Sequence, residues 1–269
     1  MKLRVNSYAK INLGLKILNK RYDNYHNIHS IFAQINLSDS IIFSPAKKFS
    51  LSSDGPECLK MPVDQSNLIS KSYQFIKNKN KTVPSEYSIH VIKNIPLGSG
   101  LGGGSSNAAT VLKSLNKLWN LNYNSKNLEN IASKIGADVP FFINGGLQLI
   151  EGIGDQQFLL DSTILKNYKF ILVIPPIHIS TSWAYAKLNK SLHSVNNYTK
   201  FSPLSKPVKW ELFENDFEDV IHEAYPEISK IKDNLNRIGA LYAGLSGSGS
   251  TVFGVFDSFQ NIESNLKDF

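Results

Sequence analysis

The sequence predicts a mixed α+β protein, with strands and helices in both halves of the chain. The first indication is a strand, a glycine-rich loop and a helix that follow one another between residues 87 and 119. The second is the alternation of apolar and polar residues over positions 3–17, which is the period of a strand. The third is a buried strand at 170–174, with helical patterns after it and a Ser/Gly loop between strand-like segments at 241–256.

Length and composition limit the class of protein. With 269 residues, 42% of them hydrophobic, the chain is long enough for one large or two modest domains. No apolar run reaches 18 residues, so we expect no membrane span and no membrane partner. The chain enters a patterned strand directly, without the features of a signal peptide, and its single cysteine fits a reducing compartment. We therefore expect a cytoplasmic protein without a disulfide framework or a structural zinc site.

The net charge of +7 is compatible with two kinds of ligand. A basic surface attracts nucleic acid, and it equally attracts a small polyphosphate. The lysines and arginines are scattered, and no cluster of basic residues interleaved with aromatics is present. We therefore expect no nucleic-acid partner, although a basic nucleic-acid-binding module stays open as an alternative.

The glycine-rich loop carries most of the chemical information. Five glycines fall between residues 98 and 104, after a predicted strand and before a predicted helix. Because glycine has no Cβ, a phosphate can approach the backbone N–H groups, and a helix N-terminus favours an anion. Ser105 and Ser106 add hydroxyl donors at the same place. The pattern predicts a phosphate-binding loop, and the alternative is a flexible turn that only caps the helix.

Three familiar nucleotide-binding loops fit this stretch poorly. A Walker A loop requires a lysine after the glycines, and none is present. Gly98, Gly100 and Gly103 satisfy the dinucleotide-binding spacing, but the following strand with its acidic residue is replaced by a second helical pattern. The partner motifs of protein kinases are also absent.

The loop resembles the phosphate loop of the GHMP kinase superfamily, and two further stretches agree with that resemblance in the expected order. Residues 7–13 (SYAKINL) resemble the first superfamily motif, and residues 245–254 (LSGSGSTVFG) resemble the third. Residues 21–26 (RYDNYH) and 136–142 (GADVPFF) resemble the branch that acts on a cytidine diphosphate derivative of methylerythritol. The likeness extends over nearly the whole chain.

This resemblance implies a fold, a reaction and two cofactors. The fold would be α+β with two domains: residues 1–153 like domain 2 of ribosomal protein S5, and residues 154–269 ferredoxin-like. The reaction would be transfer of a phosphoryl group from ATP, with Mg2+, to the 2-hydroxyl of the cytidylyl substrate, a step of isoprenoid precursor synthesis. A kinase for another small alcohol, of homoserine or mevalonate type, is the alternative.

The resemblance also implies the site residues. Lys10 and Asp138 would be catalytic, the lysine stabilising the transferring group and the aspartate accepting the substrate proton. For Lys10 the alternative is a solvent-facing lysine on the polar face of its strand, and for Asp138 it is a helix N-cap. The implied ATP-binding residues are Pro96, Leu97, Gly98, Ser99, Gly100, Leu101, Gly102, Gly103, Gly104, Ser105 and Ser106.

The implied substrate pocket consists of polar and aromatic residues from both halves. Tyr25 and Tyr185 would enclose the cytosine ring, and His26 would bond to its edge. Asn12 and Thr181 would complete the pocket. The alternative for Tyr25 and His26 is a pair that simply packs on a hairpin.

The remaining elements follow from periodicity. We predict strands at 31–37, 41–43 and 147–150, an irregular segment at 44–65, and a helix from residue 68 capped by Asp64 or Ser66. Two more helices are expected at 211–224 and 227–238.

Overall fold

The structure is a computed structural model, and it describes residues 2–80, 82–188, 198, 200–201 and 204–262. Its contacts divide the chain into two compact units. Unit 1 comprises the described residues of Met1–Lys10, Gln34–Leu97 and Gly102–Gly145. Unit 2 comprises those of Ile11–Ala33, Gly98–Leu101 and Gly146–Phe269. The predicted boundary after Ile153 divides the chain into consecutive domains, and it stays a prediction.

Four strands of the six-stranded sheet contribute residues to unit 1. They are β1 (Leu3–Lys20), β2 (His26–Ala46), β3 (Ser50–Asp54) and β4 (Glu86–Ile92). β1 pairs with β2, and β4 lies between β2, to which it is antiparallel, and β3, to which it is parallel. The predicted strand at the N-terminus and the two predicted strands at 31–43 are confirmed, the latter as one continuous strand. β3 lies in the segment predicted to be irregular, because four of its five residues are Ser or Asp and Leu51 is its one apolar residue.

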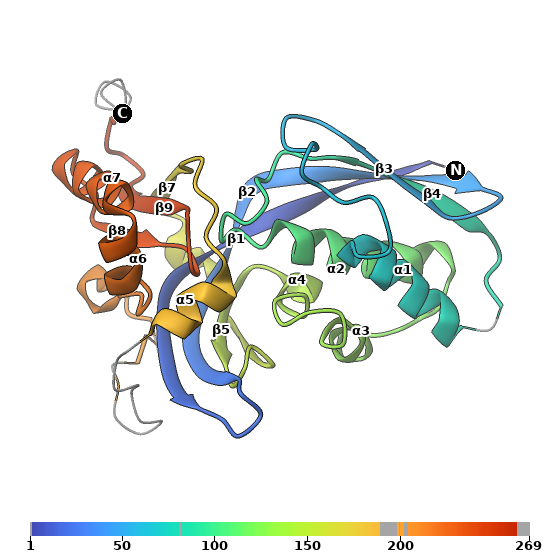
Figure 1. Cartoon of the computed structure of the whole chain (residues 1–269), viewed down its shortest axis with the longest axis horizontal. Coiled ribbons are helices and arrows are strands. Elements are labelled where there is room, and N and C mark those ends of the chain that lie inside the picture. The colour runs from blue at the N-terminus through green and yellow to red at the C-terminus, as the bar shows by residue number, and fades with distance from the viewer. Residues whose placement is uncertain (1, 81, 189–197, 199, 202–203, 263–269) are drawn as a thin grey trace. The chain divides into compact units, whose positions relative to one another are not determined.

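Four helices cover one face of this sheet (Figure 1). They are α1 (Leu68–Lys79), α2 (Gly103–Leu118), α3 (Ser125–Ala132) and α4 (Phe141–Asn144). The predicted cap of α1 was wrong: the Asn67 side chain accepts the Ile69 N–H, while the Asp64 carboxylate accepts the N–H and O–H of Ser66. Asp64 and Ser66 therefore close the turn before the helix.

Unit 2 has two sheet regions. The first part of β2 pairs with β5 (Leu147–Glu151), which pairs with β6 (Gln156–Leu160). The second sheet has the order β7 (Tyr168–Val173), β9 (Val252–Asp257), β8 (Tyr242–Leu245), all antiparallel. The sequence did not predict β6, because its three apolar residues are consecutive and therefore do not alternate with polar ones.

Three helices accompany these strands, α5 (Thr181–Lys187), α6 (Glu218–Ala224) and α7 (Pro226–Arg237), together with 3-10 turns η1 (Ser162–Leu165) and η2 (Trp210–Leu212). α7 packs Ile228 and Leu235 into a core with Ala243, Val252 and Phe256. The helix predicted over 211–224 is helical only in part. Asn215 interrupts it, because its side chain donates to Leu245 O and Gly247 O and accepts the Phe217 N–H.

Among the described residues, no helix combines the length and the apolar character that a membrane crossing requires.

Candidate active site

The N-terminus of α2 follows the glycine loop and lies in unit 1. Its N-cap, Gly102, has a φ of 68°, a left-handed conformation that glycine adopts without strain. Gly102 has no side chain with which to cap the helix. The first N–H groups of a helix have no partner inside it, so those of Gly103, Gly104 and Ser105 can receive a phosphate.

Neighbouring glycines of this helix have different roles. A Cβ on Gly103 would lie 2.8 Å from Ile95 Cγ2 and 3.1 Å from Lys93 Nζ, so this glycine is needed for internal packing. A Cβ on Gly104 would have no neighbour nearer than Leu68 Cδ1 at 3.9 Å, and Gly104 is exposed. Space for a ligand is therefore open at Gly104. Gly103 is instead needed for packing against Ile95 and Lys93, which the spacing of the glycines did not predict.

The two serines after the glycines also differ. Ser105 is partly exposed at the helix N-terminus. Ser106 is buried, its hydroxyl donates to Tyr8 O at 2.6 Å, and its N–H donates to Gly102 O. Ser105 is thus the better placed hydroxyl for a ligand, while Ser106 ties α2 to β1.

Lys10 and Asp138 lie together in unit 1. The Lys10 ammonium is 3.6 Å from Asp138 Oδ2, and the lysine side chain is 4% exposed against 37% for the aspartate. Lys10 is therefore not a solvent-facing lysine, because the middle of β1 is buried on both faces. Burial lowers the pKa of the Lys10 ammonium, while the neighbouring Asp138 carboxylate acts in the opposite direction.

Asp138 lies in the turn that precedes α4. The N-cap of that helix is Pro140, so the alternative that Asp138 is the cap was wrong. The turn is held by the Val139 N–H, which donates to Gly136 O. The aspartate carboxylate is left half exposed, beside a buried cation, where it can accept a proton from a bound hydroxyl.

In unit 2, the first part of the glycine loop packs against the Ser/Gly loop between β8 and β9. A Cβ on Gly100 would collide with Ser246 O, so only glycine allows this approach. Ser246 Oγ donates to Gly100 O at 3.0 Å, and the Thr251 N–H donates to Ser99 O at 3.1 Å. The two glycine-containing loops therefore contact each other within unit 2.

The remaining loop residues are placed as follows. Leu101 and Ser99 are buried, whereas Pro96 and Leu97 are partly exposed. Gly98 is exposed and has a φ of 68°.

His178, which no sequence pattern singled out, lies against Gly98, since a Cβ on Gly98 would collide with His178 Nδ1. The imidazole is exposed and adjoins the loop, and its position in a proline-rich turn carried no signal for this contact.

Two of the residues predicted to hold a nucleobase, His26 and Tyr185, are in direct contact. His26 stacks on Tyr185, with ring centroids 5.0 Å apart and planes 12° from parallel, and Tyr185 meets Phe217 edge to face. The Tyr25 side chain is 59% exposed. Tyr185 therefore faces His26. Burial and the nearby Lys20 charge lower the pKa of His26, so at pH 7 its ring is neutral, with one donor and one acceptor nitrogen.

Asn12 and Thr181 are both held by the polar residues of unit 2. Asn12 is buried, its side chain donates to Ser30 Oγ, and its N–H donates to Ser246 Oγ. Thr181 is the first residue of α5, and its hydroxyl shares a 2.9 Å hydrogen bond with Ser248 Oγ. Ser248 belongs to the loop that contacts Ser99 and Gly100.

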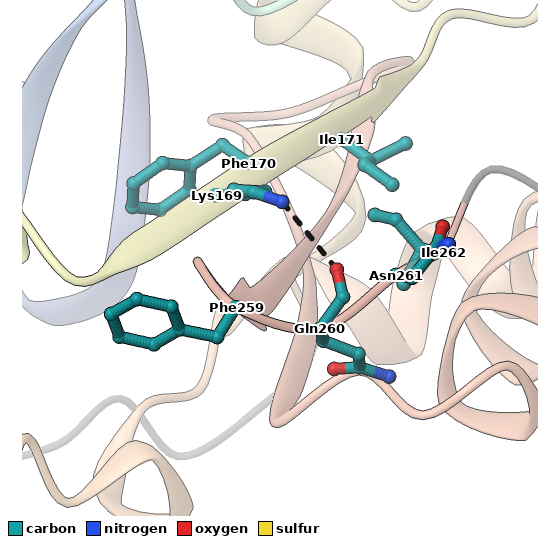
Figure 2. Close-up of a pocket in the computed structure, with 7 residues that line it drawn as sticks. All are labelled: Lys169, Phe170, Ile171, Phe259, Gln260, Asn261 and Ile262. Atoms are coloured by element: carbon teal, nitrogen blue, oxygen red, sulfur yellow. Dashed lines mark hydrogen bonds between the residues drawn. The ribbon is translucent and has the colours of Figure 1, made fainter.

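A separate groove lies beside β7, where Lys169, Phe170 and Ile171 face the segment 259–262 (Figure 2). Lys169 Nζ donates to Gln260 O at 3.4 Å across it. No predicted site residue lines this groove, so it has no part in the site described above.

An α+β fold, an open helix N-terminus after a glycine loop, and a lysine–aspartate pair beside that loop together define a small-molecule kinase. The family models for the GHMP kinases N terminal domain and the GHMP kinases C terminal match residues 67–146 and 205–269. The chain belongs to the GHMP kinases, an ATP-dependent family.

The relatives and neighbours of the chain agree with this assignment. A protein of Prosthecochloris aestuarii named 4-diphosphocytidyl-2-C-methyl-D-erythritol kinase is 39% identical over 97% of this chain and 91% of its own length. A crystal structure of 4-(cytidine 5'-diphospho)-2C-methyl-D-erythritol kinase matches with a TM-score of 0.74 at 26% identity, over 94% of this chain and 89% of that one. Homoserine kinase from Cytophaga hutchinsonii also has a TM-score of 0.74, over 99% of this chain and 90% of that one, but at 18% identity it shows the shared fold alone.

Proposed function

We propose that this protein phosphorylates the 2-hydroxyl of 4-diphosphocytidyl-2-C-methyl-D-erythritol with ATP, in non-mevalonate isoprenoid precursor synthesis. The single observation that carries the chemistry is the buried Lys10 ammonium, 3.6 Å from the half-exposed Asp138 carboxylate. The choice of substrate rests on the names of the relatives that match nearly the whole chain.

Each residue of this pair has one task in the transfer. Asp138 accepts the proton of the attacking hydroxyl while the substrate oxygen bonds to the γ-phosphorus and the bond to the ADP oxygen breaks. Lys10 supplies positive charge where negative charge accumulates during the transfer. The N–H groups of Gly103, Gly104 and Ser105 hold phosphate oxygens. The open space at Gly104 supports this assignment.

The residues present are compatible with Mg2+. This ion favours oxygen ligands, keeps several waters, and is often held through one or two protein oxygens together with substrate phosphates. The described residues contain no cluster of three His, Cys, Asp or Glu side chains that could form a closed metal site. The Ser105 hydroxyl is the protein oxygen that would assist, and the bound ion would neutralise phosphate charge.

We assign the nucleobase of the substrate to the aromatic residues of unit 2. The stacked pair of His26 and Tyr185 supports this assignment, since a base can stack on an aromatic face and bond to a neutral imidazole. Tyr25 covers the base from its exposed position, and Asn12 and Thr181 complete the pocket.

The protein acts in the cytoplasm on small molecules. The two consecutive domains, 1–153 and 154–269, are both needed for the activity.

An assay of ADP release against a panel of alcohols tests the proposal. The panel contains the cytidylyl substrate, the same alcohol without its cytidine diphosphate group, homoserine and mevalonate. We expect ADP release with the cytidylyl substrate only. Equal or greater activity with homoserine or mevalonate would refute the assignment, and salt-sensitive binding to random RNA would favour the nucleic-acid alternative.

A further inference from the structure

A fully buried carboxylate lies behind the glycine loop in unit 1. Asp39, on β2, has no exposed surface. Its Oδ1 accepts the N–H of Asn94 at 2.7 Å and that of Ile95 at 2.8 Å. Its Oδ2 accepts from Lys93 Nζ at 2.6 Å and from Asn107 Nδ2 at 2.8 Å. Four donors therefore fill the acceptor sites of one carboxylate.

These donors come from the two ends of the glycine-rich segment. Lys93, Asn94 and Ile95 directly precede Pro96, and Asn107 lies in the first turns of α2, directly after Ser106. Lys93 Nζ also donates to Ile95 O at 2.6 Å, so a local hydrogen bond holds the backbone just before the loop begins. Asp39 thus accepts hydrogen bonds both from the segment before the loop and from the helix after it.

The network continues from Asn107 to the strand that carries Lys10. The second amide hydrogen of Asn107 is donated to Ser7 Oγ at 2.9 Å, and Ser7 Oγ lies 2.7 Å from Ser106 Oγ. The Ser106 hydroxyl donates to Tyr8 O. Ser7, Ser106 and Asn107 are all at most 2% exposed. The first turn of α2 is therefore held by polar contacts that solvent does not weaken.

We propose that Asp39 is a positioning residue for the nucleotide phosphates, acting through the Asn107 amide and through the backbone N–H groups of Asn94 and Ile95. Backbone donors bind a phosphate well only if they are held in place before it arrives, because ordering them on binding weakens the affinity. Asp39 holds both sides of the loop segment in unit 1, and so orients the N–H groups at the start of α2. This inference rests on the proposed kinase function, but it does not depend on which alcohol is the acceptor.

A merely structural role would have a different signature. A buried ion pair such as Asp39 and Lys93 can stabilise the fold without influencing a ligand, and removing one charge leaves the other buried and unpaired. The informative variant therefore cuts the link to α2 and leaves the ion pair intact. Asn107→Leu does this, since leucine is similar in size and cannot donate to Asp39 or Ser7.

The experiment measures the ADP affinity and the thermal stability of the full chain. Asn107→Leu is compared with the parent and with Ser114→Ala, a change at another buried polar residue of α2 that lies outside the network. Titration calorimetry gives the Kd for ADP, and a melting curve gives the Tm. We expect the Kd of Asn107→Leu to rise by about 10-fold or more, because misplaced binding groups weaken a positioned contact strongly. Ser114→Ala should leave the Kd unchanged.

A second variant keeps the test decisive if Asn107→Leu folds poorly. Ser7→Ala removes one hydroxyl of the network and leaves every ion pair, so it should fold and raise the ADP Kd by about 3-fold, a smaller effect of the same kind. A lower Tm with an unchanged ADP Kd in both variants would overturn the positioning role. A parent that binds ADP but does not phosphorylate the cytidylyl substrate would refute the proposed function and leave this inference standing.

Discussion

The aliphatic part of the Lys10 side chain passes directly over Gly102. A Cβ on Gly102 would lie 3.2 Å from both Cγ and Cε of the lysine, and 2.9 Å from Phe142 Cζ. The N-cap of α2 and the buried cation of the site are therefore in contact inside unit 1. A side chain at residue 102 would displace the lysine from Asp138 as well as strain a left-handed backbone.

Replacing Asp138 by asparagine tests the proton acceptor. Asp138→Asn keeps the shape of the side chain and removes its basicity, so kcat should fall by about 10²-fold or more. The Kd for ATP should hardly change, because the phosphates bind at the α2 N-terminus. Asp257→Asn, at an exposed aspartate outside the site, is the matched control. Activity within a few-fold of the parent would show that Asp138 is not the base.

The two adjacent glycines of α2 should respond differently to valine. Gly104→Val places methyl groups in the open space at the helix N-terminus, so the Kd for ATP should rise by about 10-fold, or ~1.4 kcal/mol, with little change in Tm. Gly103→Val pushes on Ile95 and Lys93 instead, so it should destabilise the fold by about 1–3 kcal/mol. Calorimetry and melting curves on both variants make the comparison. If Gly104→Val binds ATP as the parent does, the phosphates bind elsewhere.

Tyr185 should matter to one substrate and not to the other. Stacking of a base on an aromatic side chain is worth about 1–3 kcal/mol, so Tyr185→Ala should raise KM for the cytidylyl substrate by about 5- to 150-fold. The KM for ATP should stay near the parent value. Tyr185→Phe keeps the ring that stacks on His26 and is the control. A rise in the ATP constant alone would place Tyr185 on the adenine side.

The pKa of Lys10 predicts opposite trends in activity and stability at alkaline pH. Because burial lowers this pKa below 10.5, the folded chain releases the proton before the unfolded chain does. The contribution of Lys10 to the free energy of unfolding therefore rises with pH between its lowered pKa and 10.5. Over the same interval kcat/KM should fall, since the neutral amine no longer stabilises the transferring phosphoryl group.

Two measurements separate these trends. The pH profile of kcat/KM should show an alkaline limb below pH 10.5, and denaturant unfolding of the parent and of Lys10→Met should reveal the contribution of Lys10 to stability over the same range. A limb caused by unfolding would instead coincide with a loss of stability in the parent. That result would show that loss of the Lys10 charge is not the cause of the alkaline limb.

Sequence alone determined the local elements of the site. Alternation predicted β1 and β4, and helical spacing predicted α2, because these periods follow directly from backbone geometry. The glycines marked the loop, since Gly98, Gly100 and Gly102 adopt positive φ values that other residues rarely take. Asn24 likewise has a φ of 67° in the turn before β2, a conformation that asparagine tolerates better than most residues. The order of three motifs was enough to indicate the family.

Only the tertiary structure decided which of these residues act together. By pattern, Lys10 is one more polar residue of an alternating strand, and its burial beside Asp138 depends on packing between segments far apart in the sequence. Asp39 has no local signal at all, because its four donors come from the segment after β4 and from α2. The stacking of His26 on Tyr185 arises in the same way. Periodicity reports how a side chain is oriented on its own element, whereas a long-range contact depends on which elements pack together, and no local pattern records that.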